Sequence, residues 1–417
     1  MTELREWLED TFYALNLTDK ENIHKGFSRL GYTKEEAAAH NQFLKIADGL
    51  GLNTYRDEIG NQWAVWEVDK SKKTIAMGSH LDTVYNGGGY DGVAGILCAL
   101  ASIKMLMDKK VKPNRNVAII CFASEESARF GISTIGSKGI TGQLDKDKIA
   151  DIGDKDEMTI KQAIEEFGLS WNDIENAELP TDKIESFLEL HIEQGNILQE
   201  KHADIGIVNG VARPIRFVVK VRGQANHTGT TPMNKRRDAL VEAAPLISFI
   251  NNEAQKVYES SSLVATVSTL KLTPNAMNII PGEVELGIDI RSVKDQVKHD
   301  FAAKFKAFCS ETEKENNVTI DIHTLVDDQS ITLDNKLQNK LLKAAQKEGL
   351  KTLKMDSGAG HDVMNMAQKW PSGLIFIPCK DGISHHPEEY TSLDHLVKGS
   401  QVLQRFLEEE LNHNPIK

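Results

Sequence analysis

His80, Leu81 and Asp82 form a His-x-Asp motif, in which an imidazole and a carboxylate are two residues apart. In extended backbone such residues face the same side, so Asp82 can accept one imidazole N–H of His80 and leave the other nitrogen for a metal. An isolated motif of this kind is more often a turn aspartate beside a core histidine. The metal interpretation therefore depends on the other ligands that the sequence supplies.

Further carboxylates follow shortly afterwards. Asp91 stands just before an apolar stretch with helical spacing, and Glu125 and Glu126 come directly after the apolar run Asn116–Ala123. If the backbone stays extended, the two glutamate side chains diverge, so one can bind a metal while its neighbour faces the substrate. Paired glutamates after a strand are usually solvated, and the spacing alone does not say which of the two would be the ligand.

Two later segments add imidazoles. In the segment 187–194 the apolar and polar residues alternate, which places His191 on the polar face with Glu189 and Glu193. The last apolar run, Gly373–Cys379, leads into His385 and His386, and the spacing cannot choose between these two histidines.

Together these positions supply enough ligands for two ions. The candidates are His80, Asp91, one of Glu125 and Glu126, His191 and His385. If one carboxylate bridges, each ion has three protein donors and an open position, which is typical of a catalytic site. Nitrogen and oxygen ligands without thiolate suit zinc, with manganese, cobalt or nickel as alternatives. We expect two divalent ions per chain.

The segment Gly87–Gly92 also matches the Gly-x-Gly-x-x-Gly pattern of dinucleotide-binding turns. It begins well beyond the predicted strand end at His80, and Asp91 would bring a carboxylate to the place where a pyrophosphate meets backbone amides. We therefore favour metal chemistry over nucleotide binding for this segment.

The elements that carry these residues read as an α/β domain. Strands are expected near Thr74–His80, Val117–Ala123, Phe187–His191 and Leu374–Cys379, with helices between them. Open α/β sheets bind their ligands at the carboxyl ends of the strands. Most of the predicted ligands lie at or just beyond such ends.

Between these parts the periodicity changes in the order β-α-β-β-α-β, which is typical of a ferredoxin-like domain. The expected segments are Pro214–Gln224, Asp238–Gln255, Leu263–Thr273, Asn278–Arg291, Val297–Asn316 and Val318–Val326. We predict an inserted domain over residues 212–327, with residues 1–211 and 328–417 forming the metal-binding α/β domain.

Composition and charge restrict the possible partners. The chain has 417 residues, of which 40% are hydrophobic, and its net charge of −12 opposes binding to nucleic acid or anionic lipid. The beginning of the sequence lacks the pattern of a signal peptide, and nowhere do about 18 apolar residues run together. The four cysteines lie far apart without Cys-x-x-Cys spacing, as expected of buried thiols. We expect a cytoplasmic protein that acts on a small molecule.

Several stretches resemble the dinuclear-metal aminoacylase and carboxypeptidase G-like hydrolases, and within them the N-carbamoyl-L-amino-acid hydrolase and allantoate amidohydrolase branch. They span nearly the whole chain in the order of the family. The stretches are GSHLDTVYNGGGYDGVAG (78–95), FASEESARFG (122–131), ELHIEQG (189–195), ANHTGTTPMNKRRDAL (225–240), NIIPGEVELGIDIRS (278–292), SGAGHDVMNMA (357–367) and GISHHPEEYT (382–391).

The resemblance implies a role for each predicted ligand. Asp91 would bridge the two ions, with His80 and His191 completing one site, and Glu126 and His385 completing the other. Glu125 would be the general base, and Asp82 belongs to the catalytic group. His386 stands where the family usually has another side chain. The family further implies that the inserted domain is a lid and a dimerisation surface, so we expect a homodimer.

Substrate contacts are implied for His227, Asn278, Arg291, Gln194 and the Gly358–Gly360 backbone. The Arg291 guanidinium can offer a two-pronged contact to a carboxylate, although a surface ion pair with Asp289 or Glu285 is the alternative. His227 lies in a loop rich in glycine and threonine and could stabilise an oxyanion after lid closure. Its alternative is a solvent-facing loop histidine.

The expected reaction is metal-dependent hydrolysis of the ureido C–N bond of N-carbamoyl-L-amino acids. Allantoate and N-carbamoyl-β-alanine are the nearest alternative substrates, and an aminoacylase or dipeptidase would use the same metals with a different pocket. A non-catalytic metal-binding homologue would be expected to lack the base or a ligand, but Glu125 and all five ligand candidates are present.

Overall fold

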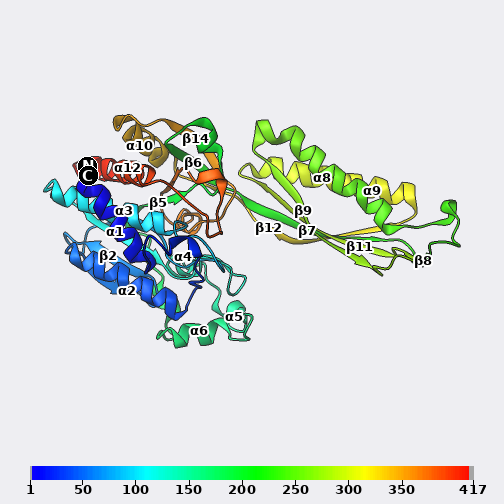
Figure 1. The fold of residues 1–417 in the computed structure, drawn as a ribbon, viewed down its shortest axis with the longest axis horizontal. Coiled ribbons are helices and arrows are strands. Elements are labelled where there is room, and N and C mark those ends of the chain that lie inside the picture. Colours follow the sequence, from blue (N-terminus) through cyan, green and yellow to red (C-terminus); the bar gives the residue numbers. More distant parts are fainter. Residues whose placement is uncertain (1, 413–417) are drawn as a thin grey trace. The chain divides into compact units, whose positions relative to one another are not determined.

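The computed structural model describes residues 2–412, which divide into two compact units (Figure 1). The larger comprises the chain up to Asn209, Leu333–Met355 and the chain from His361 onward, and the smaller comprises Gly210–Thr332 with Asp356–Gly360. The smaller unit thus includes residues 210–211, 328–332 and 356–360, which we had predicted to belong to the larger. Segment 356–360 joins it through hydrogen bonds, such as that from the Ala212 N–H to the Ser357 carbonyl (2.8 Å).

The sheet of the larger unit runs β1-β2-β4-β3-β5-β15-β6, with β14 beside β6. Its four central strands, β4, β3, β5 and β15, are parallel. All residues of β3 and β4 are buried and most are apolar, as expected for strands covered on both faces. The strands are β1 (Asn53–Arg56), β2 (Gln62–Trp66), β3 (Thr74–His80), β4 (Asn116–Phe122), β5 (Ile184–Ile192), β6 (Ile205–Val211), β14 (Thr352–Ser357) and β15 (Ser372–Ile377).

Helix α3 lies at the centre of the apolar core and packs on β3, β5 and α12. Gly95 permits this close approach, because a Cβ atom there would lie 2.3 Å from the Leu190 carbonyl oxygen. The helices of this unit are α1 (Thr2–Asn16), α2 (Lys34–Gly49), α3 (Val93–Asp108), α4 (Ile135–Thr141), α5 (Lys146–Ile149), α6 (Ile160–Glu166), α7 (Ile197–Lys201), α10 (Asn335–Lys347), α11 (Val363–Met366) and α12 (Leu393–Asn412).

The smaller unit contains an antiparallel sheet in the order β12-β7-β11-β9, with α8 and α9 side by side against one face (Figure 1). Along β11 the residues alternate between buried and partly buried, which places Val284, Leu286 and Ile288 in the core beneath the helices. The elements are β7 (Arg213–Arg222), β8 (Asn226–His227), α8 (Ala239–Ser261), β9 (Val264–Thr273), β10 (Ile279–Ile280), β11 (Glu283–Ser292), α9 (Asp295–Asn316), β12 (Thr319–Asp327) and β13 (Ile331–Thr332).

The predicted fold class is confirmed: an α/β unit with a parallel centre is accompanied by a β-α-β-β-α-β unit. One predicted strand was wrong in its extent, since Asn278–Arg291 divides into β10 and β11 at Pro281 and Gly282. Proline has no N–H to donate to a sheet, and the chain turns there. All four cysteines are buried and free. Within residues 2–412 no helix is both long and apolar enough to span a membrane.

Candidate metal centre

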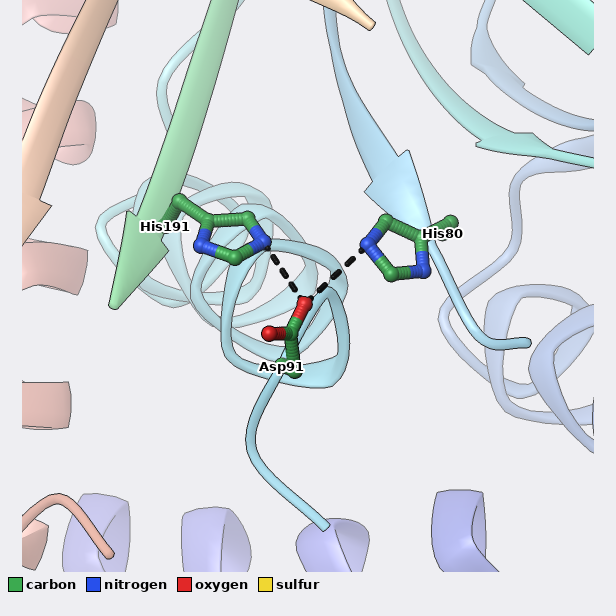
Figure 2. A group of neighbouring side chains, drawn as sticks. All are labelled: His80, Asp91 and His191. Atoms are coloured by element: carbon green, nitrogen blue, oxygen red, sulfur yellow. Dashed lines mark ion pairs between the residues drawn. The ribbon is translucent and has the colours of Figure 1, made fainter. Parts of the chain in front are cut away.

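His80, Asp91 and His191 converge from three elements of the larger unit (Figure 2). His80 ends β3, His191 lies near the end of β5, and Asp91 precedes α3. One carboxylate oxygen of Asp91, Oδ1, lies 3.3 Å from His80 Nε2 and 3.1 Å from His191 Nε2. All three side chains are buried, so the group forms a compact set of donors shielded from water.

The far ring nitrogens of both histidines face backbone carbonyls. His80 Nδ1 lies 3.0 Å from the Asp82 carbonyl oxygen, and His191 Nδ1 lies 2.9 Å from the Ile192 carbonyl oxygen. These contacts favour the tautomer with the proton on Nδ1, which leaves a lone pair on each Nε2. The Gly92 N–H donates to His191 Nε2 at 3.2 Å, in agreement with this assignment.

A cation satisfies this geometry, because two lone-pair nitrogens and a carboxylate oxygen otherwise face one another. Burial alone would lower the pKa of His191, but the Asp91 carboxylate raises it overall. In the same way burial would raise the pKa of Asp91, and His191 and His80 hold it well below the usual range. The site therefore attracts positive charge between these three residues, and its donor set fits a divalent metal ion.

A second group is formed by Asp91, Glu126 and His385. His385 Nε2 lies 3.2 Å from Glu126 Oε1 and 3.5 Å from Asp91 Oδ2. Asp91 thus offers one oxygen to each group, as a bridging ligand would. His386 is exposed, and its Nδ1 accepts the Glu388 N–H at 3.2 Å. The structure therefore brings His385, the histidine preferred by the family resemblance, to the predicted ligands.

Asp82 connects the loops that follow the neighbouring strands β3 and β4. Its carboxylate accepts the backbone N–H of Glu125 at 3.0 Å and that of Glu126 at 2.9 Å. The predicted contact with His80 is longer, at 3.4 Å from Nδ1, since the nearer acceptor of that nitrogen is the Asp82 carbonyl. Asp82 therefore orients the pair of glutamates as well as the imidazole.

The turn before the glutamates has a strained backbone. Ser124 has φ = 52°, in the left-handed region that non-glycine residues rarely adopt. The buried Glu36 holds it there, accepting the Ser124 N–H at 2.8 Å through one oxygen and the Tyr32 N–H through the other. Such strain persists only where the surroundings enforce it, and it is common at functional sites.

Glu125 lies beside the first group, with Oε2 3.8 Å from His80 Nε2. Burial raises its pKa well above the usual range, against the opposing effect of His80. His80, Glu125 and Glu126 also form a third possible ligand group. Because Glu126 contacts His385 and Glu125 does not, the geometry is consistent with Glu126 as ligand and Glu125 as base, and these roles stay predictions.

Gln194 was predicted to contact the substrate. In the structure its Nε2 donates to Asp91 Oδ2 at 2.6 Å, and Ser384 Oγ donates to the same oxygen at 2.9 Å. Gln194 Oε1 is buried without a hydrogen-bond partner, so the carboxamide has one unused acceptor at the centre.

The remaining predicted contacts lie in the smaller unit. Arg291 Nε donates to Asp289 Oδ1 at 2.8 Å, and Nη1 donates to the Gly358 carbonyl at 2.9 Å. The ion pair with Asp289 that was considered as the alternative is therefore present. It fixes the guanidinium beside segment 356–360, and about a quarter of the side chain (27%) stays exposed.

His227 ends the short strand β8, and Asn278 directly precedes the short strand β10, which pairs with β8. Both residues are exposed, and His227 Nδ1 accepts the Gly229 N–H at 3.0 Å. The Asn278 carbonyl accepts the Thr228 N–H at 3.2 Å. Gly358 and Gly360 are also exposed. The substrate contacts implied for these residues stay predictions.

Sequence reasoning missed several buried acids around the centre. Glu189 accepts hydrogen bonds from Ser79 Oγ and the Val363 N–H, and Asp362 accepts one from Ser137 Oγ. Glu389 bonds to the loops that carry Asp91 and His385. Glu189 stood on the predicted polar face of its strand, but nothing in the local pattern distinguished it from a solvated glutamate.

Comparison with known proteins identifies the family. The profile described as Peptidase family M20/M25/M40 matches residues 76–409. The chain belongs to this family. The family match confirms the prediction that the chain is a hydrolase. It also confirms the family resemblance found in the sequence.

Two relatives and one solved structure show how far the M20/M25/M40 similarity extends. The allantoate amidohydrolase of Escherichia coli strain K12 is 33% identical over 97% of this chain and 97% of its own length. The N-carbamoyl-L-amino-acid amidohydrolase of Paenarthrobacter aurescens is 32% identical over 92% of each. A Burkholderia multivorans amidase of the hydantoinase/carbamoylase family superposes with a TM-score of 0.88 at 25% identity, covering 99% of this chain and 98% of the other. The names of these relatives support amidohydrolase activity.

Proposed function

We propose that the chain hydrolyses N-carbamoyl-L-amino acids at a site that holds two divalent ions, with zinc as the first candidate. The observation that carries this proposal is the position of Asp91, whose two oxygens face two different ligand groups. His80 and His191 would hold one ion with Asp91, and Glu126 and His385 would hold the other. When bound, such ions lower the pKa of water and polarise a carbonyl group.

Glu125 acts as the proton carrier in this proposal. It takes a proton from the attacking water and delivers it to the leaving nitrogen. Burial favours this role, because it raises the pKa of the Glu125 carboxyl above the usual range of a glutamate. Asp82 fixes the Glu125 backbone through the 3.0 Å hydrogen bond, which keeps the carboxylate next to His80.

The two ends of the substrate would be bound by the smaller unit. Arg291, held by Asp289, offers its Nη atoms to the amino-acid carboxylate. His227 supplies a ring nitrogen for the developing oxyanion. One water is consumed, and the products are the amino acid, ammonia and carbon dioxide.

Allantoate is the second candidate, because it presents a ureido group beside a carboxylate and a relative named allantoate amidohydrolase matches 97% of the chain. N-Carbamoyl-β-alanine and N-acyl amino acids differ in chain length and in the acyl group. Comparing these compounds tests the specificity of the substrate pocket, because all of them would use the same metal chemistry.

The test combines elemental analysis with kcat/KM for N-carbamoyl-L-methionine, N-carbamoyl-β-alanine, allantoate and N-acetyl-L-methionine. We expect up to two zinc ions per chain, loss of activity with chelators, and the highest kcat/KM for the N-carbamoyl-L-amino acid. A preference for allantoate would overturn the substrate ranking, and a preference for the acetyl compound would overturn the branch. A protein that binds no divalent ion after reconstitution would overturn the proposed site.

A further inference from the structure

Glu389 is a buried carboxylate, only 1% exposed, at the end of the loop that carries His385. Its Oε1 accepts the backbone N–H of Tyr90 at 2.9 Å and that of Asp91 at 2.8 Å. Its Oε2 accepts the His385 N–H at 3.3 Å and lies 3.0 Å from Ser384 Oγ, whose single proton is shared with Asp91 Oδ2. The partners of both oxygens are uncharged, and they come from two loops almost 300 residues apart in sequence.

The packing around Glu389 leaves little room for another arrangement. Gly88 lies directly against it, and a Cβ atom at Gly88 would be 2.4 Å from Glu389 Cβ. The Glu389 N–H also donates to the His386 carbonyl at 3.0 Å, which closes the turn between His386 and Glu389. The carboxylate therefore joins the Asp91 loop and the His385 loop at a fixed separation.

The two ligand groups differ in how their members are held. His80 and His191 lie on the neighbouring strands β3 and β5, and their rings are oriented by the backbone carbonyls of Asp82 and Ile192. His385 lies on a loop with φ = 57°, and nearly half of its side chain (48%) is exposed. Both groups share Asp91, whose loop Glu389 holds, but only the second group has a further ligand, His385, on a loop held by Glu389.

We propose that Glu389 is a positioning residue for the ion bound by Asp91, Glu126 and His385, and that it does not itself contact the metal. This inference rests on the proposed two-ion site. Residues behind the ligands commonly contribute 10- to 100-fold to metal affinity, because they fix the orientation of the ligands. Glu389 orients Asp91 through its backbone and through Ser384, and His385 through its N–H.

The substitution Glu389→Gln tests the inference with a minimal change of shape. A carboxamide has one accepting oxygen, and its NH2 group would face an N–H donor in one of the two loops. Glu388→Gln is the matched control, since Glu388 is the adjacent glutamate and is exposed. Each full-length protein is stripped with a chelator and titrated with zinc alone by calorimetry, and the thermal unfolding of the stripped proteins is recorded.

We expect wild type and Glu388→Gln each to bind two zinc ions. The affinity of each site should be the same in the two proteins. Glu389→Gln should lose about 10- to 100-fold in affinity at the site of His385, lose less at the site of His80 and His191, and unfold close to the wild-type temperature when stripped. Glu389→Asp, which restores a carboxylate on a shorter side chain, should recover part of the affinity. It also provides a test should the glutamine variant fail to fold.

Two outcomes would overturn the inference alone. One is two unchanged zinc affinities in Glu389→Gln. The other is equal weakening of both sites together with a lower unfolding temperature of the stripped protein, which would indicate general support of the fold. If wild type itself binds fewer than two zinc ions, the proposed function fails first, so the two failures are distinguishable.

Discussion

Asp82 accepts the backbone N–H of Glu126 at 2.9 Å, although the two residues lie on the loops that follow different strands. The same carboxylate accepts the N–H of Glu125. The backbone of both glutamates is therefore held by the Asp82 side chain, through their N–H groups.

Asp82→Asn should weaken this arrangement, because one end of the carboxamide would present N–H groups to a backbone N–H. We expect kcat to fall about 10- to 100-fold, with zinc content close to wild type, as for other residues behind a metal site. Steady-state kinetics and elemental analysis check the prediction. Unchanged kcat would mean that the backbone holds the glutamates without Asp82.

Glu125→Gln should lower kcat by at least about 100-fold while both zinc ions are retained, since a carboxamide cannot accept the proton of the attacking water. Glu126→Gln is the comparison variant, and its main effect should be a lower zinc content. If metal is lost from the Glu125 variant and retained by the Glu126 variant, the roles of the two glutamates are reversed.

Arg291→Lys should raise KM about tenfold, which corresponds to one lost charge-assisted hydrogen bond to the substrate carboxylate. Arg216→Lys is a suitable control, because Arg216 also pairs with Asp289, at 2.8 Å, from the neighbouring strand β7. Equal changes in the two variants would indicate that the effect comes from the ion-pair network and not from substrate binding.

His40 provides a test of stability against pH. Burial lowers its pKa to about 4, whereas an unfolded histidine titrates near 6.5. Between these values the unfolded chain binds a proton that the folded chain does not, so His40 makes the free energy of unfolding fall as the pH falls from 6.5 toward 4. At pH 5 the loss is on the order of 2 kcal/mol.

Thermal unfolding of the chelated wild type and His40→Asn between pH 7.5 and 5 measures this effect. Asparagine keeps an acceptor near Gln62, which faces His40 Nδ1 at 3.4 Å, and does not titrate. Titrating groups remote from residue 40 contribute equally to both proteins, so the difference in slope reports His40 together with its neighbour Glu36, whose Oε1 lies 3.8 Å from His40 Nε2. Parallel pH profiles would contradict the assignment of a neutral buried histidine.

The homodimer expected from the family resemblance is tested at the edges of the smaller sheet. Strand β9 is an edge strand, and Leu270 on it is 51% exposed. Unpaired edges with apolar side chains are suited to pairing with a second copy. We predict that light scattering finds a dimer that Leu270→Lys weakens. Leu325→Lys on the other edge strand, β12, serves as control, and a fully active wild-type monomer at micromolar concentration would refute the dimer.

The strands around the site could be predicted because their signals are local. The predicted strand Thr74–His80 has the same bounds as β3, and the helix expected after Asp91 is α3. The positions of the ligand candidates could then be inferred from these strands, since parallel strands bring their carboxyl ends to one edge of the sheet. The short strands β1 and β2 were missed, because β1 is mostly polar and the apolar run of β2, Trp63–Trp66, is short.

Contacts between distant segments could not be predicted in this way. Glu389 is followed in sequence by an exposed tyrosine and preceded by an exposed glutamate, so its burial is invisible in the local pattern. The pairing of Arg291 with Asp289 was foreseen as an alternative because both lie on one face of a strand. The carbonyl of Gly358 was not foreseen as its second partner, because that contact joins segments 67 residues apart.

In the sequence, the smaller unit stands between the predicted ligands, and this order has a consequence for biosynthesis. His80, Asp91, Glu126 and His191 are translated before it, and His385 only after it. Because domains fold as the chain emerges from the ribosome, a nascent chain arrested after β13 would already contain the strands β7 to β12 but only four of the five ligands. In the proposed site, complete loading with two ions would therefore wait until β15 and the loop that follows it have been synthesised.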